Sequence, residues 1–234
     1  MAANSPPTTD LLTGSNLTDI LDFLRRAEGL KIQMRSGFTS IGRPESVAEH
    51  TWRLSLWTLV VADAFPEVDH ARLVKLCLIH DLGEALNGDI PAPMQRGPGA
   101  KAHDERQDLL ALIAPLPDGP RNEILGLWDE YEANLTPEAR LAKALDKLET
   151  ILQHNQGDNP ADFDYRFNLG YGQQYTQDDP RIVTIRQILD AETEARAVEA
   201  AQNSPKLEAL LAGITDENLH PEQDFGPPVG AEEW

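Results

Sequence analysis

Four side chains have the types and surroundings of a metal site: His50, His80, Asp81 and Asp146. Each lies beside apolar residues, in a stretch that has the pattern of a buried helix. Burying imidazoles and carboxylates is costly unless they are paired or bind a metal ion. Nitrogen and oxygen ligands of this kind suit Mn²⁺, Co²⁺, Fe²⁺, Mg²⁺ or Zn²⁺. We therefore expect a hydrolase site with one or two divalent ions, which make a water molecule nucleophilic.

Taken singly, these residues have more ordinary interpretations. His50 alone would be a core histidine that is hydrogen-bonded to a neighbour. Asp146 alone would form an ion pair with Lys143 or Lys147. A second His-Asp pair, His103-Asp104, lies in the polar stretch GAKAHDERQD and is typical of a solvated surface. The four residues lie on three different predicted helices. The metal hypothesis therefore requires the fold to bring all four side chains close together.

Helices must position these residues. Ser46 and Glu49 form a capping box that starts a helix reaching about residue 64, with His50 on its apolar face. A helix over 70–86 would present Leu73, Leu76, His80 and Glu84 on one face. A helix over 137–154 begins at Thr136-Pro137 and carries Asp146. Further helices are predicted at 16–33, 100–114, 119–133, 180–202 and 205–212, with a loop at 35–45, a Pro/Gly-rich loop at 91–101 and an ordered surface loop at 155–178.

The predicted fold is therefore all-α, a bundle of about seven to nine helices. We expect one domain over 16–212, a disordered N-terminal tail over 1–15 and an acidic, flexible tail over 213–234.

Composition limits the partners. The chain has 234 residues, 41% of them hydrophobic, and a formal net charge of −19. That charge disfavours a nucleic-acid polymer or an anionic membrane surface, but a bound cation still permits a small phosphorylated substrate. The single cysteine, Cys77, excludes an intrachain disulfide and a thiolate metal cluster. The N-terminal residues have no secretion signal and no apolar run is long enough to span a bilayer, so we expect a cytoplasmic protein.

Three strings in order carry a resemblance to a known family: RPESVAEH, HDLGEALNGDIP and ALDKLE. The pattern resembles the HD-domain metal-dependent phosphohydrolases, and is similar to the branch that contains 5′-deoxynucleotidases. The likeness spans roughly residues 17–190. It implies that His50, His80, Asp81 and Asp146 are the metal ligands.

The resemblance also implies roles for residues around the ligands. Glu84 matches the acid that exchanges a proton with the attacking water or the leaving group. Asp89 matches an acid that recognises the sugar, with Ile90 and Pro91 beside it. Arg35 is the best match for the arginine that orients the phosphate, and Arg43 is the alternative. The products would be a nucleoside and inorganic phosphate.

Two departures from the family pattern affect these expectations. Phe38 stands nearest to where several relatives have a tryptophan after the arginine, and Ala92 replaces a hydroxyl residue. The alternatives are therefore another phosphomonoester, a phosphodiester, or a non-catalytic helical scaffold that binds metal. Glu84 and Asp89 argue against the scaffold, because metal binding alone needs neither. Dimers are common among such relatives, so the resemblance leaves a homodimer open.

Overall fold

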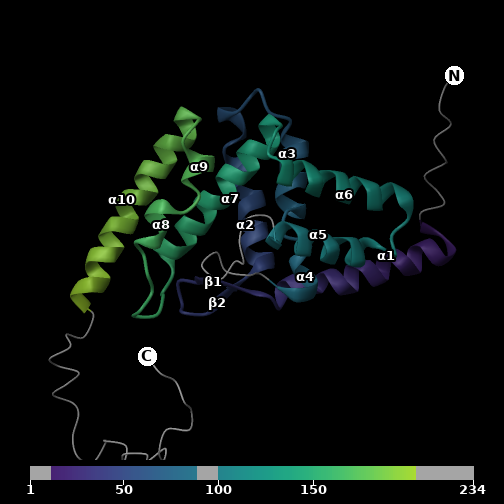
Figure 1. Ribbon diagram of the computed structural model, residues 1–234, viewed down its shortest axis with the longest axis horizontal. Helices are drawn as coiled ribbons and strands as arrows, with labels where there is room; N and C mark the ends of the chain where they lie inside the picture. The colour runs from purple at the N-terminus through teal and green to yellow at the C-terminus, as the bar shows by residue number, and fades with distance from the viewer. Residues whose placement is uncertain (1–11, 89–99, 204–234) are drawn as a thin grey trace, which may run out of the picture.

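The computed structural model describes residues 12–88 and 100–203, and these are mainly helical (Figure 1). Seven of the described helices have seven or more residues, which confirms the all-α prediction. They are α1 (Gly14–Ala27), α2 (Val47–Val60), α3 (His70–Ile79), α5 (Ala100–Ile113), α6 (Asp118–Ala133), α7 (Pro137–Gln156) and α10 (Pro180–Asn203). The short helices are α4 (Glu84–Asn87), α8 (Phe167–Gly170) and α9 (Gln173–Thr176), with 3₁₀ turns at Glu28–Lys31 and Ala62–Ala64.

Helix α7 is the centre of the bundle. It packs against α2, α3, α6 and α10, and Figure 1 shows it between α10 and the α2–α3 pair. Thr136 caps its start by accepting a hydrogen bond from Ala139 N at 3.1 Å, and Pro137 occupies its first turn, as predicted. Leu145, Leu148 and Ile151 are fully buried along it. A helix held on several sides is a rigid support for a functional side chain such as Asp146.

Helix α2 begins where the capping box predicts. Ser46 Oγ accepts from Glu49 N at 3.3 Å, and Glu49 Oε2 accepts from Ser46 N at 2.9 Å. The two bonds satisfy donors that the first turn of a helix leaves unpaired. They fix the start of α2, and so fix His50 on the buried side of its first turn.

Helix α3 is shorter than predicted: it ends at Ile79, whereas the sequence predicted an end near residue 86. Residues 80–83 form a turn with i→i+3 bonds, Leu82 N to Ile79 O and Glu84 N to Asp81 O, before α4 begins. The turn lets the chain approach α5 closely. A Cβ on Gly83 would lie 2.5 Å from the carbonyl oxygen of Glu105. His80 and Asp81 are therefore turn residues, and Glu84 starts a separate helix.

Two apolar clusters lie on either side of the polar residues. Along α2, Val47 belongs to one cluster and Leu54 to the other, with His50 between them. In α3 and the turn after it, Leu76 belongs to the cluster of Leu54, and Leu82 belongs to the cluster of Val47. The polar centre is thus placed at the boundary between two hydrophobic cores, where little water reaches it.

Two segments that were predicted as loops contain regular secondary structure. The predicted loop at 35–45 is a two-stranded antiparallel hairpin, β1 (Met34–Phe38) with β2 (Pro44–Ser46), in which Met34 pairs with Ser46. The ordered loop predicted at 155–178 contains α8 and α9. The helix at 205–212 and the tail at 213–234 lie outside the described residues, as do most of 1–15 and 91–101. Among the described residues, none of the helices has the length and apolarity to cross a membrane.

Candidate metal centre

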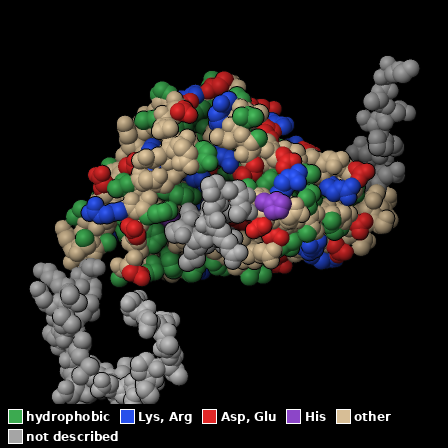
Figure 2. Space-filling model, in the orientation of Figure 1, with side chains coloured by type: hydrophobic (Ala, Val, Ile, Leu, Met, Phe, Trp, Pro, Cys, Tyr) green, Lys and Arg blue, Asp and Glu red, His purple; other side chains and the backbone are tan. Residues whose placement is uncertain are grey.

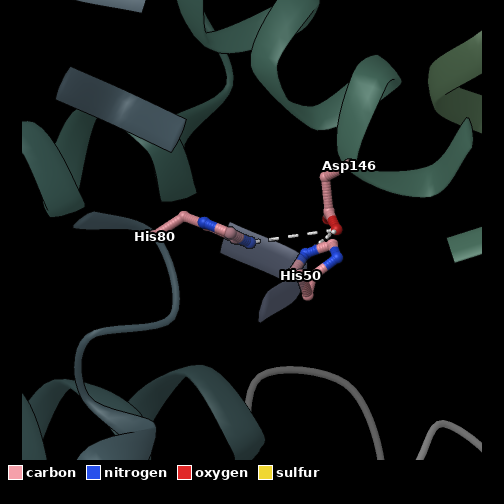
Figure 3. Close-up of side chains that lie close together, drawn as sticks. All are labelled: His50, His80 and Asp146. Atoms are coloured by element: carbon pink, nitrogen blue, oxygen red, sulfur yellow. Dashed lines mark ion pairs between the residues drawn. The ribbon is translucent and has the colours of Figure 1, made fainter. Parts of the chain in front are cut away.

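His50, His80 and Asp146 converge from α2, from the turn after α3 and from α7 (Figure 3). His50 Nε2 lies 3.2 Å from Asp146 Oδ1, and His80 Nε2 lies 3.8 Å from the same oxygen. Asp81 completes the group, because its Oδ2 is 3.0 Å from His80 Nε2 and 3.7 Å from His50 Nε2. The four residues singled out in the sequence are therefore brought together.

The donor set fits a divalent cation. His50 Nε2 and His80 Nε2 are both buried, and neither makes a hydrogen bond within the described residues. Buried polar atoms without a hydrogen bond are rare in folded proteins and call for an explanation. Two imidazole nitrogens and two carboxylate oxygens at this spacing suit a first-row divalent ion.

Other contacts of His80 and Asp146 leave one atom of each residue to face the centre. His80 Nδ1 lies 2.8 Å from Cys77 O, so its Nε2 points inward. Asp146 Oδ2 accepts a hydrogen bond from the Tyr131 hydroxyl at 2.9 Å and lies 2.9 Å from Lys147 Nζ. That arrangement leaves Asp146 Oδ1 for an ion. The ordinary ion pair predicted for Asp146 with Lys147 is thus present together with the cluster.

The electrostatics favour ionised carboxylates. Burial would raise the pKa of Asp146, but the Lys147 ammonium and the two imidazoles hold that pKa well below its ordinary value. Burial also opposes ionisation of Asp81, but His80, His50 and the Arg35 guanidinium lower its pKa. Both acids are therefore negatively charged at neutral pH, as metal ligands must be.

His50 is more basic than an ordinary histidine in the metal-free protein. Burial and the nearby Arg35 charge lower its pKa, but the Glu149 and Asp146 carboxylates outweigh them and raise the pKa to about 9. An ion that binds Nε2 near neutral pH must therefore displace a proton.

Arg35 lies at the centre and Arg43 does not. Arg35 comes from β1, and its Nη1 donates to Asp81 Oδ2 at 3.3 Å while its Nη2 donates to Thr150 Oγ1 at 2.9 Å. The side chain of Arg43 is half exposed, and its Nη2 donates to Glu49 Oε1 at 2.6 Å. The hairpin thus directs one of the two candidate arginines toward the ligands and the other toward the start of α2.

Glu84 is buried, with 2% of its surface exposed, so it is not a solvated acid at a helix end. It is the first residue of α4, four positions after His80. Asp89, Ile90 and Pro91 lie outside the described residues. His103 and Asp104, the second His-Asp pair, are exposed on α5, as the polar surroundings predicted.

Sequence reasoning missed two buried glutamates beside the ligands. Glu149 Oε2 contacts His50 Nδ1, and Glu149 Oε1 accepts from Arg53 Nε at 2.6 Å. Glu45 Oε2 lies 3.8 Å from Arg35 Nε. Burial and the Glu149 charge raise the pKa of Glu45 to about 7. A spacing signal existed for Glu149, because residues three apart on a helix share a face and Glu149 follows Asp146 by three.

Comparison with known proteins identifies the family. The model of the HD domain family matches residues 27–186. The chain is 32% identical over 205 residues to the 5′-deoxynucleotidase HDDC2 of Bos taurus, covering 86% of this chain and 98% of the relative. It is 39% identical over 143 residues to the enzyme of the same name from Danio rerio, covering 60% of this chain and 70% of that one.

A solved structure supports the same assignment. A protein described as a predicted metal-dependent phosphohydrolase, from Magnetospirillum magnetotacticum, is 25% identical and superposes with a TM-score of 0.65. The match covers 82% of this chain and all of that one, 100%. With this fold, this family match and a His/Asp cluster that can hold a divalent ion, the chain belongs to the HD domain family and is a metal-dependent phosphohydrolase.

Proposed function

We propose that this chain hydrolyses nucleoside 5′-monophosphates, including the deoxy forms, to a nucleoside and inorganic phosphate. The observation that carries the proposal is the convergence of His50, His80, Asp81 and Asp146 around two buried Nε2 atoms without hydrogen bonds. The relatives named 5′-deoxynucleotidase point to the substrate class. In this proposal the four residues are the metal ligands.

The ion and the protein have separate tasks. A bound divalent ion supplies Lewis-acid chemistry, since it lowers the pKa of water and offsets the charge of the phosphate. Asp81 and Asp146 supply the negative charge that retains the ion, and the two imidazoles complete its ligand set. The buried position between two apolar clusters keeps bulk water away and strengthens each charge interaction.

Arg35 is the proposed phosphate-binding residue. Its guanidinium donates to Asp81, so it places a positive charge beside the proposed ligands, where a phosphate would bind. Arginine suits this task because it donates two parallel hydrogen bonds and keeps its charge at any relevant pH. Two further contacts position the guanidinium: its Nη2 donates to Thr150 Oγ1, and its Nε lies 3.8 Å from Glu45 Oε2.

Glu84 is the proposed proton-exchange residue. It follows His80 through the tight turn, so its backbone is fixed relative to the ligands. A buried carboxyl in that position can take a proton from the attacking water or give one to the leaving alkoxide. Asp89, with Ile90 and Pro91, remains the proposed contact for the sugar.

We also propose that the protein acts in the cytoplasm on free nucleotides, as a homodimer. On the face shown in Figure 2, acidic and basic side chains of the described residues are intermixed, unlike the continuous basic surface that a nucleic-acid polymer contacts. Trp52, Leu56 and Leu59 are exposed on one side of α2, as in a subunit interface. Light scattering after size exclusion tests the dimer, and a monomeric mass would contradict it.

A substrate panel tests the activity. The purified protein, loaded with Mn²⁺ or Co²⁺, is assayed for phosphate release from nucleoside monophosphates such as dAMP and AMP, with triphosphates, cyclic nucleotides and sugar phosphates as comparisons. We expect the monophosphates to give the highest kcat/KM. Faster turnover of a cyclic nucleotide would assign the site to a phosphodiester, and faster turnover of a sugar phosphate would assign it to another phosphomonoester.

A further inference from the structure

Glu149 is fully buried, contacts His50 Nδ1 and forms an ion pair with Arg53, whose side chain is 22% exposed. We propose that Glu149 is a positioning residue for the metal centre, which holds His50 in the tautomer and ring orientation that turn Nε2 toward the ion. Arg53 holds Glu149 in place in turn. This inference rests on the ligand set of the proposed function, and it assigns a role to two residues outside that set.

The two ring nitrogens of His50 have different neighbours. Nε2 lies 3.2 Å from Asp146 Oδ1, on the side of the proposed ion, while Nδ1 contacts Glu149 Oε2. A neutral imidazole carries one proton, and an acceptor at Nδ1 keeps the proton there. The lone pair is then on Nε2, where a metal ligand needs it. A carboxylate partner also makes the imidazole a stronger ligand.

Glu149 itself is fixed from two helices. It is fully buried on α7, and its second oxygen, Oε1, accepts from Arg53 Nε at 2.6 Å. Arg53 reaches across from α2, one turn after His50, and its Nη1 donates to Gln156 Oε1 of α7 at 3.2 Å. The acceptor that faces His50 is therefore held in position before any ion binds.

A comparison with His80 shows why the contact between Glu149 and His50 can be removed without a change in the backbone. His80 Nδ1 faces the backbone carbonyl of Cys77, one turn earlier in its own segment, so the orientation of His80 follows from the local fold. The partner of His50 is a side chain from another helix, 99 residues away in the sequence. A substitution can remove that partner and leave the backbone unchanged.

A structural role alone would make a different prediction. Buried ion pairs contribute little net stability, because apolar side chains of similar volume often replace them at no cost. If the pair only joined α2 to α7, replacing both members by leucine would leave metal binding unchanged. If Glu149 orients His50, the same double replacement leaves a stable fold that binds the ion more weakly.

The experiment compares four variants of the full-length protein with wild type, the fourth being His50→Ala. Glu149→Gln retains an acceptor but removes the charge, and the double variant Arg53→Leu with Glu149→Leu removes the acceptor without stranding an arginine. Thr193→Val is the matched control, because Thr193 is fully buried and its hydroxyl donates to Asn155 of α7. The side chain of Thr193 is thus as fully buried as that of Glu149. Its hydroxyl donates to Asn155 Oδ1 and Leu189 O, not to His50.

Two readouts do not depend on activity. Competition with a chelator gives the Kd for Mn²⁺. Proton–nitrogen spectra of histidine-labelled protein loaded with Zn²⁺, which is diamagnetic, show which ring nitrogen of His50 carries the proton. We expect the Kd to rise about tenfold in Glu149→Gln and toward about 100-fold in the double variant. The Nδ1–H signal of His50 should weaken in the double variant, and Thr193→Val should lower Tm without changing the Kd.

A wild-type Kd in Glu149→Gln, together with a wild-type His50 spectrum, overturns the positioning role even if the double variant does not fold. His50→Ala separates this result from a failure of the ligand set. If His50→Ala loses Mn²⁺ binding while Glu149→Gln retains it, only the positioning role is overturned. If His50→Ala still binds Mn²⁺ with wild-type affinity, the proposed ligand set is overturned as well.

Discussion

His50 Nε2 and Asp146 Oδ1 lie 3.2 Å apart, although they belong to separate helices, α2 and α7. Two ligand atoms that each bind an ion at about 2.1 Å, at right angles, are separated by about 3.0 Å. The His80–Asp81 separation of 3.0 Å has the same size. The other two separations are 3.7 Å, from His50 to Asp81, and 3.8 Å, from His80 to Asp146. The ligand atoms of His50, His80 and Asp146 all lie within 4.8 Å of one another, and Asp81 Oδ2 lies beside the two imidazoles.

The two His-Asp pairs of the chain provide a matched test of the ligand set. Asp81→Asn keeps the shape of the side chain but removes the charge that faces both imidazoles, whereas Asp104 is exposed on α5. We expect Asp81→Asn to reduce phosphate release and metal content by more than about 100-fold. Asp104→Asn should change neither by more than about twofold. Metal analysis and a phosphate assay on both proteins measure this, and full activity of Asp81→Asn would contradict the site.

The two arginines of the hairpin make a second matched pair. Arg35→Lys keeps the positive charge but removes the planar fork, so we expect kcat/KM to fall by about 10–100-fold, equivalent to about 1.5–3 kcal/mol. Arg43→Ala removes an exposed contact to Glu49 and should leave kcat/KM within about threefold. Steady-state kinetics with a nucleoside monophosphate decide between them. A large loss in Arg43→Ala alone would assign phosphate binding to Arg43.

The capping box of α2 gives a stability prediction. Ser46→Ala removes the acceptor for Glu49 N and should lower the free energy of unfolding by about 1 kcal/mol. For a chain of this size, that corresponds to a fall in Tm of about 2–4 °C. Ser40→Ala, at an exposed serine of the hairpin turn, is the control and should shift Tm by less than about 1 °C. Thermal melts of both variants check this, and equal shifts would show that the cap contributes nothing.

Metal binding should depend on pH through His50. Its pKa in the metal-free protein is raised from 6.5 to about 9, and only the neutral imidazole binds an ion. The affinity for the ion should therefore rise by up to about tenfold per pH unit from pH 7 to 9, and then level off. A folded-state pKa above the unfolded value stabilises the metal-free fold below pH 6.5, and this stabilisation is lost as pH rises through 9. A Kd for Mn²⁺ that is constant from pH 7 to 9 would contradict the raised pKa.

Local signals in the sequence predicted the supports of the site well. The caps at Ser46 and Thr136 are made by residues three apart, so they can be read directly from the sequence. The apolar stripe that ends in His80 and Glu84 also predicted that both side chains are buried. The wrong inference was that one helix continues through them. The turn at 80–83 depends on the close approach of Gly83 to α5, which is a contact distant in the sequence.

The side chains that contact the proposed ligands could not be predicted from local sequence signals. Whether Arg35 or Arg43 faces the centre depends on the register of the hairpin, whose strands have only five and three residues. The partners of His50 and Asp146 depend on how α2, α6 and α7 pack together. Tyr131 and Glu149 reach these ligands only once the bundle has formed.

We propose that His50, His80, Asp81 and Asp146 hold one divalent ion. Anomalous diffraction from a crystal of the Mn²⁺-loaded protein, collected at the manganese edge, tests this most directly. We predict one strong peak within about 2.0–2.3 Å of both Nε2 atoms and of an oxygen of each carboxylate. A map with no peak between these four side chains, from a protein that binds Mn²⁺ in solution, would contradict the account.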